Sequence, residues 1–448
     1  MRYGLDFGTS NSAIGLCRNG RVELAPVDPL APNPGTVRTL LWIGRDGNVE
    51  IGEAAVRAFV AGNAGRQIRR SRVWYDELIT TEFGDEYIQF DADVDIRGRF
   101  FQALKTVLRD PEYGGTDVFG TSYAIEELVA VVLREIKRRA DAHYGTEVDR
   151  VLLGRPVRFA EDVEADRIAE ERLRHAAEMA GFRDIAFLYE PLGAAFHYET
   201  QLRHEELALV FDFGGGTLDL SLVRLGPERL GRGDRADDIL AVRGVLLGGN
   251  TFNEDVMEVR LMRYFGQHAR WRTTGGTELP MPAHIYAQLR AWYTMSLLNE
   301  RQTIRFIQEM RRATKSYREI DALLSLIVGN YGWDLFQEIE RAKCELSTAR
   351  YTKIQFFQEA IAISELLTRS AYEAIIAPHL ADIDRALDQV LADAGVHAEE
   401  LGVVLRTGGA SLTPCVQALL EHKFGAARVR EQEVFTSVAS GLAVAASR

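Results

Sequence analysis

The sequence contains few cysteines and no long hydrophobic run. Its three cysteines, Cys17, Cys344 and Cys415, lie far apart and form no CxxC pair. This spacing excludes a disulfide framework and a cysteine zinc site, and it indicates a reducing compartment. No apolar run is long enough to cross a bilayer, and the residues after Met1 do not resemble a signal peptide. We therefore expect a cytoplasmic protein without a membrane partner.

Basic residues are also in deficit. The 53 Lys and Arg residues are outnumbered by 65 Asp and Glu residues, which gives a net charge of −12. This charge argues against nucleic acid as the main partner. The 448 residues, 46% of them hydrophobic, are typical of a soluble globular chain that is long enough for two large lobes.

Two glycine-rich turns carry the strongest pattern in the chain. In the stretch LALVFDFGGGTLDLSLVRL, residues 207–225, an apolar run leads to Asp212 and then to Gly214, Gly215 and Gly216. Three consecutive glycines let backbone N–H groups turn toward a phosphate that meets no Cβ atom. Asp212 would repel that phosphate unless a cation lies between them, and Mg²⁺ suits both groups. Taken alone, the stretch is equally compatible with a plain hairpin turn.

The N-terminus repeats this arrangement. A short strand from Arg2 leads to Asp6, and the run GTSNS, residues 8–12, forms the tip before the chain runs back. Two turns that carry the same acid at the same place can hold a polyphosphate from opposite sides. The alternative, two unrelated glycine turns, stays open at this point.

Several motifs resemble those of a known superfamily. Two stretches, DFGTSNS from Asp6 and FDFGGGTLDLSL from Phe211, resemble the two phosphate motifs of actin-like ATPases. A third, TGGASLTP from Thr407, resembles their adenosine motif. Those similar to the DnaK, or heat-shock-protein-seventy, branch are YEPLGAAFHY from Tyr189, LLGGNTFN from Leu246 and ERAKCELS from Glu340. The likeness covers nearly the whole chain in order. The chain most resembles the short YegD-type relatives, which lack a peptide-binding domain.

The resemblance implies a two-lobed α/β fold of the actin-like, ribonuclease-H-like type, in which each lobe has a mixed sheet flanked by helices and an outer subdomain. The expected parts are lobe one at 1–203 with its outer subdomain near 36–120, lobe two at 204–434 with its outer subdomain near 253–351, and a helix at 435–448 that returns to lobe one. Independently, the strand, helix, strand order from Leu152 to Leu188 predicts a parallel sheet. The apolar pattern from Ala360 to Ala394 predicts one continuous helix.

The resemblance also implies the site and its ligands, ATP or ADP with Mg²⁺. The residues implied to organise the ion and the attacking water are Asp6, Glu190, Asp212, Thr217 and Asp219. Those implied to contact the phosphates are Gly8, Thr9, Ser10, Asn11, Gly214, Gly215, Gly216 and Thr217. Those implied to contact the nucleoside are Gly248, Gly249, Asn250, Glu340, Lys343, Ser347, Gly408, Gly409 and Ala410. From the residues alone, Glu190 is as well explained as a helix N-terminal acid, and Glu340 with Lys343 as an ordinary salt bridge.

One functional residue of the family is missing from the stretch where it is expected. The family holds a catalytic lysine in the outer subdomain of lobe one, but residues 65–74, GRQIRRSRVW, contain no lysine. Arg70 is the best match in register, with Arg69 and Arg72 as competitors. An arginine can stabilise a phosphoryl group in transfer but cannot act as a base. The alternative for this cluster is a solvated basic face.

The resulting hypothesis is a monomeric, slow, Mg²⁺-dependent ATPase whose lobes open and close in a chaperone-related role, with a protein client or exchange factor as a further partner. Cys344 and Leu412 stand where the family commonly has adenine-stacking arginines, so base specificity is less secure than phosphate binding. Three alternatives remain: a nucleotide-binding scaffold without turnover, an actin-like filament protein, and an acceptor kinase.

Overall fold

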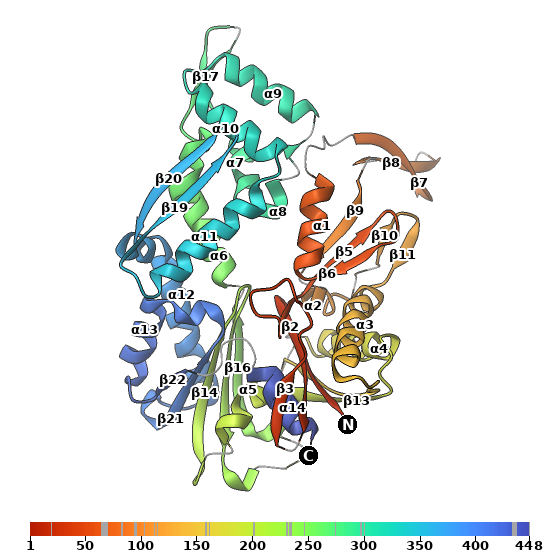
Figure 1. Ribbon diagram of the computed structural model, residues 1–448, viewed down its shortest axis with the longest axis vertical. Coiled ribbons are helices and arrows are strands. Elements are labelled where there is room, and N and C mark those ends of the chain that lie inside the picture. Colours follow the sequence, from red (N-terminus) through yellow and green to blue (C-terminus); the bar gives the residue numbers. More distant parts are fainter. Residues whose placement is uncertain are drawn as a thin grey trace.

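The computed structural model describes most of residues 1–447. The residues outside the description are 19, 64–69, 82–83, 94–95, 103, 112, 114, 157–158, 161, 200–201, 230–231, 233–234, 246, 274, 296–297, 300, 432–436 and 448. At 70–81, 84–93 and a few isolated helix positions, only the backbone is described. The chain forms two lobes that stand side by side, each with a sheet below and an outer subdomain above (Figure 1).

Lobe one is built on a six-stranded mixed sheet. Its strands are β1 (Tyr3–Phe7), β2 (Asn11–Arg18), β3 (Arg21–Leu24), β12 (Arg150–Arg155) and β13 (Asp184–Tyr189), in the order β13-β12-β1-β2-β3, with β4 (Val37–Arg38) paired to β2. β1, β12 and β13 run parallel, as the strand, helix, strand pattern predicts. The sheet packs against α3 (Ile125–Tyr144) and α4 (Val163–Met179), because the apolar side chains of both helices recur at helical spacing.

The outer subdomain of lobe one follows β4. Its elements are β5 (Leu40–Gly44), β6 (Val49–Ile51), α1 (Glu53–Asn63), the hairpin β7 (Arg70–Thr81) with β8 (Gly84–Asp93), β9 (Gly98–Gln102), α2 (Leu104–Val107), and the hairpin β10 (Thr116–Val118) with β11 (Thr121–Tyr123). β6, β5 and β9 form one antiparallel sheet, and α1 packs on it. The β7–β8 hairpin therefore lies, in sequence, between α1 and the β9–α2 segment.

Lobe two has a five-stranded sheet in the order β16-β15-β14-β21-β22. Its strands are β14 (Glu206–Phe213), β15 (Leu218–Leu225), β16 (Ile239–Val245), β21 (Leu401–Thr407) and β22 (Val429–Glu431). β14 and β15 form the hairpin that carries the three glycines, and they pair along their whole length from Glu206↔Leu225 to Phe213↔Leu218. The helices α12 (Arg369–Ala394) and α13 (Pro414–Phe424) pack in this half of the lobe.

The outer part of lobe two is mainly helical. Its elements are α6 (Gly249–Val256), η3 (Met257–Leu261), η4 (Met262–Phe265), β17 (Arg270–Arg272), β18 (Glu278–Pro280), α7 (Ala283–Leu289), α8 (Trp292–Met295), α9 (Arg301–Arg312), α10 (Tyr317–Val328), α11 (Gly332–Leu346), β19 (Tyr351–Gln358) and β20 (Ile361–Thr368). One apolar core joins this subdomain to the sheet below it.

The prediction of a continuous helix over Ala360–Ala394 is wrong in its first quarter. Residues 361–368 form β20, which pairs with β19 in an antiparallel hairpin, and α12 begins only at Arg369. Within β20 the side chains of Ile361, Ile363, Glu365 and Leu367 are buried, while the alternate residues 362, 364 and 366 are exposed. This period of two is a strand pattern, and the cross-strand pairing with β19 outweighs the helical reading of the apolar residues.

Two crossing helices join the lobes. α5 (Glu190–Glu199) follows β13, and α14 (Ser437–Ala446) packs against α5, β1 and β2. Their backbones meet at two glycines, because a Cβ atom on Gly441 would lie 1.8 Å from the carbonyl oxygen of Gly193. An apolar core of both lobes surrounds this crossing, with Leu192 and Leu442 buried beside residues of β14 and β21.

We expect Gly441→Ala to lower the free energy of unfolding by about 1–3 kcal/mol, since the added methyl group must push two backbones apart. Helix propensity alone would favour alanine at this position, by about 0.5–1 kcal/mol. The control is Gly275→Ala, where the nearest atom to the new Cβ lies 3.8 Å away. Urea unfolding measures both variants, and equal midpoints for Gly441→Ala and the wild type would show that the crossing tolerates a side chain.

Candidate functional site

The two glycine turns come from different lobes and face each other. The first turn (Gly8–Ser10) follows β1, and the second turn (Gly214–Thr217) follows β14. A Cβ atom on Gly216 would lie 3.1 Å from Ser10 Oγ, and one on Gly215 would lie 3.7 Å from the same oxygen. The structure thus brings together two short segments that are about two hundred residues apart in the sequence.

The glycines of this site serve two different purposes. At Gly8 a Cβ atom would lie 2.2 Å from the Asn11 carbonyl oxygen, and at Gly248 it would lie 2.3 Å from the Gly215 carbonyl oxygen, so close backbone packing requires glycine there. At Gly214 a Cβ atom would approach only the Thr217 carbonyl oxygen, at 3.7 Å. The second turn therefore offers backbone that side chains leave uncovered, as a bound anion needs.

Four carboxylates converge beside the turns. Asp6 lies in β1, Glu190 is the first residue of α5, and Asp212 and Asp219 are cross-strand partners in β14 and β15. Burial, followed by the charge of Glu190, raises the pKa of Asp6 to about 7. Burial, followed by the charges of Asp219, Asp6 and Glu190, raises the pKa of Asp212 to about 8. Each acid therefore acts on the others across the lobe boundary, and we call this group the central site.

A lysine that the sequence analysis did not single out belongs to the central site. Lys105 in α2 is 7% exposed, and its Nζ donates a hydrogen bond to Glu190 Oε1 at 2.5 Å. Burial lowers the pKa of Lys105, but the charges of Glu190, Asp6 and Asp219 outweigh burial and place its pKa above the ordinary value. Lys105 is the cation among four acids.

The position of Lys105 explains why it was missed. The lysine of the outer subdomain was expected within residues 65–74, but the β7–β8 hairpin follows that stretch, and the chain reaches the central site only after β9. The available signal was the run ALKTVL, in which Lys105 stands beside Leu104 and one turn before Leu108, both buried. Arg70 begins β7, but its side chain and that of Arg72, like the whole of Arg69, lie outside the described part of the chain.

A buried threonine supports the first turn from behind. Thr39 donates its backbone N–H to the Ser10 carbonyl oxygen (2.9 Å), and its Oγ1 donates to the Gly8 carbonyl oxygen (2.8 Å) and lies 2.8 Å from Ser12 Oγ. Asn11 pairs with Arg38 across β2 and β4. The segment that enters the outer subdomain of lobe one therefore fixes the shape of the first turn, a role that no sequence motif indicated.

The second turn packs on the start of α6. Gly248 is the N-cap residue, Gly249 N–H donates to the Gly214 carbonyl oxygen at 3.0 Å, and Asn250 N–H donates to the Gly215 carbonyl oxygen at 2.8 Å. On the other side of the turn, Thr217 Oγ1 donates to Asp219 Oδ2 at 2.8 Å. These three hydrogen bonds hold the turn in one conformation beside the acids.

A polar group next to α6 contains the expected nucleoside residues of α11. Lys343 Nζ donates to Glu340 Oε2 at 2.6 Å and to the Gly249 carbonyl oxygen at 3.0 Å, and Asn253 Nδ2 donates to Glu340 Oε2 at 2.7 Å. Cys344 Sγ lies 3.5 Å from Glu340 Oε1. Glu340 and Lys343 thus belong to the wall of the same site and are not an isolated surface pair.

The third glycine motif closes this wall. Gly408 has a φ of 81°, and a Cβ atom there would lie 2.3 Å from the Phe213 carbonyl oxygen, so glycine is required by conformation and by space. Gly409 and Ala410 follow in a short 3-10 helix, and a Cβ atom on Gly249 would lie 3.6 Å from Ala410 Cβ. Ser347 caps the end of α11 and is half-buried, and no side-chain bond ties it to this wall among the contacts given for the described residues.

A family model matches most of the chain. The family model described as Hsp70 protein matches residues 2–270 and 318–447. The chain belongs to the Hsp70 family. Together with the two mixed sheets and their flanking helices, this match confirms the α/β, two-lobed, actin-like ATPase fold and an Hsp70-like nucleotide-binding protein. The unmatched residues 271–317 correspond to β18, α7, α8 and α9 of the outer part of lobe two.

The residues of the central site fit the nucleotide and divalent cation that Hsp70-family proteins bind. Burial and the neighbouring acids raise the pKa values of Asp6 and Asp212 well above the ordinary range, which shows that this group of carboxylates is short of positive charge even with Lys105 present. A hard cation prefers oxygen ligands of this kind. Among the described residues, no three acidic, histidine or cysteine side chains converge closely enough to ligate a metal directly, so these acids fit an ion that they contact through water.

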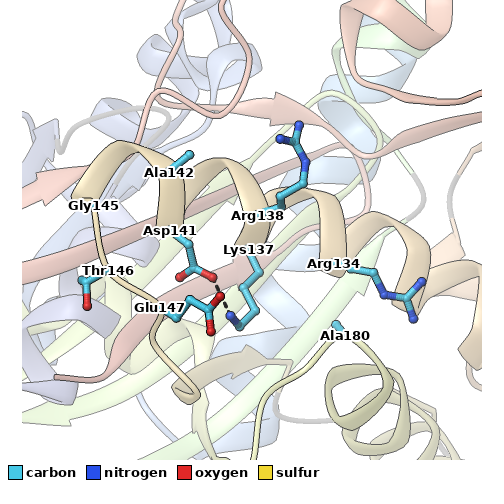
Figure 2. Close-up of a pocket in the computed structure, with 9 residues that line it drawn as sticks. All are labelled: Arg134, Lys137, Arg138, Asp141, Ala142, Gly145, Thr146, Glu147 and Ala180. Carbon is cyan, nitrogen blue, oxygen red and sulfur yellow. Dashed lines mark hydrogen bonds and ion pairs between the residues drawn. The ribbon is translucent and has the colours of Figure 1, made fainter.

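A surface hollow of about 470 Å³ lies elsewhere, at the C-terminal half of α3 (Figure 2). Three cations line it, and each is engaged within the protein. The pairs are Arg134 Nη2 with the Met179 carbonyl oxygen, Lys137 Nζ with Asp141 and Arg138 with Glu135. The hollow is therefore no substitute for the central site of this Hsp70-family chain. Within the described residues, no helix has both the length and the apolar composition that a bilayer span requires.

The raised pKa values of Asp6 and Asp212 predict a falling stability with rising pH. The folded protein holds protons on these acids that the unfolded chain releases near pH 4, so the free energy of unfolding decreases between about pH 4 and pH 8, by at most about 1.4 kcal/mol per pH unit for each group. Asp212→Asn should flatten this slope between about pH 4 and 8. Glu164→Gln, on the exposed surface of α4, is the control that should keep it. Thermal unfolding at several pH values measures the slope, and an unchanged slope in Asp212→Asn would contradict the assignment.

Proposed function

We propose that this Hsp70-family chain is a slow Mg²⁺-dependent ATPase that hydrolyses ATP to ADP and phosphate and whose lobes close differently over the two nucleotides. The observation that supports hydrolysis is the position of Lys105, which bonds to Glu190 and is also acted on by the charges of Asp6 and Asp219. A catalytic lysine is what the family resemblance requires and what residues 65–74 lack.

The turns and their neighbours would bind the triphosphate. The first turn, with Asn11, and the second turn would hold the phosphates through backbone N–H groups and the hydroxyl groups of Thr9, Ser10 and Thr217. Asp6, Glu190 and Asp212 would hold Mg²⁺ through its water ligands, and Mg²⁺, when bound, neutralises phosphate charge and favours departure of the leaving group. The positions of Thr39 and α6 keep both turns in place before the ligand arrives.

Lys105 and the remaining acids would act on the γ-phosphate and the attacking water. The Lys105 ammonium group provides a point charge that stabilises negative charge on the transferred group. Glu190, Asp219 and Thr217 provide oxygen atoms that accept hydrogen bonds from water and orient it for in-line attack. A lysine, unlike the Arg70 considered from the sequence, can also shift a proton in such a group.

The nucleoside wall would carry the ribose and the base. Glu340 and Lys343 have oxygen and nitrogen atoms suited to the ribose hydroxyl groups, and Gly248, Gly249, Asn250, Ser347, Gly408, Gly409 and Ala410 surround the same space. Cys344 and Leu412 provide no guanidinium plane for the base. From the family resemblance, we propose that the protein is a cytoplasmic monomer with a chaperone-related role. Its further partner would be a protein client or an exchange factor.

A second function is a nucleotide-binding scaffold without turnover. One observation favours it: Lys105 and Glu190, the two groups most needed for hydrolysis, are bonded to each other. If this ion pair persists when nucleotide binds, neither group would be free to act on the phosphate or on water. Both functions require nucleotide binding, and they differ only in phosphate release.

The first test is nucleotide-dependent stabilisation. ATP with Mg²⁺, at about a hundredfold excess over its Kd, should raise the free energy of unfolding by about 2.7 kcal/mol. Asp6→Asn should reduce the part of this gain that depends on Mg²⁺. Thermal unfolding with ATP, with ATP and Mg²⁺, and with Mg²⁺ alone separates these contributions. No stabilisation of the wild type by ATP and Mg²⁺ would overturn the proposed function.

The second test concerns Lys105. We expect Lys105→Ala to slow single-turnover ATP hydrolysis by about a hundredfold, because it removes a preorganised charge from the transition state, while nucleotide still stabilises the variant. Lys137→Ala is the matched control, since Lys137 is a half-buried lysine of lobe one with an equally short carboxylate contact, to Asp141. If Lys105→Ala hydrolyses ATP at the wild-type rate, Lys105 has no catalytic role. If the wild type itself releases no phosphate, the scaffold function is favoured.

A further inference from the structure

Residues 270–318 reverse the sign of the chain's charge. They contain nine Lys and Arg residues and three Asp and Glu residues, whereas the whole chain has a net charge of −12. The family model leaves residues 271–317 unmatched, so most of these cations lie outside the pattern that identifies the family. Figure 1 shows β17 and α9, which belong to this stretch, at the top end of lobe two and well above α6. The cations are therefore a feature separate from the central site.

The strand β17 and its contacts bring several of these cations to one end of the lobe. Trp271 forms an antiparallel bridge with Thr314 and turns toward α9, where it meets Phe306 edge to face at 5.8 Å and 87°. Because side chains alternate across a strand, Arg270 and Arg272 lie on the opposite, outer face, and both are exposed. We call the exposed cations of this end the basic tip: Arg270, Arg272, Arg305, Arg312, Lys315 and Arg318.

Three cations of the basic tip have no partner. Arg305 and Arg312 are seven residues apart in α9, so they lie on the same face of the helix, about 10 Å apart along its axis. Lys315 follows in the turn between α9 and α10. Within the described part of the chain, none of these three side chains forms a hydrogen bond or an ion pair, whereas the two arginines of β17 share Glu278 at 4.0 and 3.1 Å. The protein itself therefore leaves three positive charges uncompensated at this end.

An exposed aromatic ring lies among the cations. Tyr317 is the first residue of α10, two positions after Lys315, and it is 46% exposed. The guanidinium carbon of Arg318 lies 5.9 Å from the centre of its ring. A nucleic-acid base can stack on such a ring, and a neighbouring arginine adds to the attraction.

We propose that the basic tip binds single-stranded nucleic acid, with phosphates on Arg305, Arg312 and Lys315 and a base stacked on Tyr317. Cations without a partner in the protein can contact phosphates without first giving up an ion pair, and such contacts do not depend on base sequence. An acidic protein segment would also match the cations, but it would leave the exposed ring without a role. This inference goes beyond the proposed function and does not rest on it.

The negative net charge of the chain does not oppose this binding. Averaged over all residues, the charge argues against nucleic acid, but the average hides the separation of the two signs. Charges screen one another over about 10 Å at 0.1 M ionic strength, so acids in the lower halves of the lobes have little effect at the tip. α9 itself contains four arginines and one glutamate.

The test measures binding of a fluorescein-labelled oligouridine of about 16 nucleotides to the full chain by fluorescence anisotropy. Oligothymidine of the same length tests DNA beside RNA. The NaCl concentration is varied between about 50 and 200 mM, because the logarithm of the association constant should fall linearly with the logarithm of the salt concentration. For the wild type we expect a Kd in the range of about 1–100 μM, typical of binding without sequence specificity.

Two variants separate the phosphate contacts from the stacked base. The combination Arg305→Gln, Arg312→Gln and Lys315→Gln should weaken binding at least tenfold at about 50 mM NaCl. It should also make the salt dependence shallower by about 2, since each contact to a single strand contributes about 0.7 to the slope. Tyr317→Ala should weaken binding about tenfold at every salt concentration and leave the slope unchanged.

The matched control combines Arg21→Gln, Arg203→Gln and Lys353→Gln. These residues are also two arginines and one lysine, all exposed and without a side-chain partner among the described residues, but they lie in β3, just before β14 and in β19. The control therefore changes the net charge by the same amount and should bind like the wild type. Thermal unfolding shows whether each variant is folded, and Tyr317→Ala decides if the triple variant is not.

The outcomes support or overturn the inference as follows. Weaker binding and a shallower slope in the tip variant alone support it. The inference is wrong if the wild type binds neither oligonucleotide at about 50 mM NaCl, or if the control loses as much affinity as the tip variant. Poly-glutamate of matched charge is the competitor for the alternative partner. If it displaces oligouridine as well as unlabelled oligouridine does, and Tyr317→Ala binds like the wild type, the tip fits an acidic protein and the inference fails. None of these results depends on ATP binding at the central site.

Discussion

The structure depends on four carboxylates that two lobes bring to one place. Asp6 and Glu190 come from lobe one, and Asp212 and Asp219 from lobe two, with Lys105 as their cation. Like charges in a buried position oppose folding unless protons or cations compensate them. The surrounding structure is arranged to keep them there: strands end at the acids, glycine turns follow, and Thr39 and α6 hold the turns from outside. The carboxylates that would bind the cation are therefore the same groups whose mutual repulsion opposes folding.

Much of this arrangement could be predicted from the sequence because it repeats. Asp6 and Asp212 each precede a glycine turn, and the repetition made a shared ligand more plausible than two unrelated turns. Lys105 could not be placed in the same way, since its partners lie at 6, 190 and 219, and the long β7–β8 hairpin shifts it away from the stretch where the family pattern put it. Thr39 was missed for a related reason. Its role consists of hydrogen bonds to backbone carbonyl groups, and no sequence pattern indicates such bonds. The reading of 360–394 as one helix failed because apolar residues two apart and four apart coincide there, and only the pairing with β19 separates them.

The two junctions between the lobes differ in kind. Below the central site, Glu199 at the end of α5 is fully buried, accepts hydrogen bonds from Arg235 and from the backbone N–H of Gly226, and so ties lobe one to lobe two beside a continuous apolar core. Above it, the outer subdomains meet through half-buried rings, Phe59 and Phe100 against Trp292, and through one amide hydrogen bond, from Asn330 to the Val60 carbonyl oxygen. Removing one partner of a buried ion pair costs more than separating exposed rings, which water can cover on both sides. Relative motion of the lobes is therefore easier at the top than at the base.

Because the lobes separate more easily at the top, repulsion between the charges of the central site affects how far the lobes open. Lobe one contributes two acids and Lys105, while lobe two contributes Asp212 and Asp219, and its Lys343 is already paired with Glu340, so both faces carry net negative charge when the acids ionise. Their repulsion acts across the lobe boundary and favours separation at the top, where the ring contacts between the outer subdomains oppose it. A divalent cation, or protons on Asp6 and Asp212, would reverse the sign of that force. Closure of the lobes should accordingly be strongest when the positive charge that the acids require has been supplied, which makes the bound ion part of what holds the two lobes together.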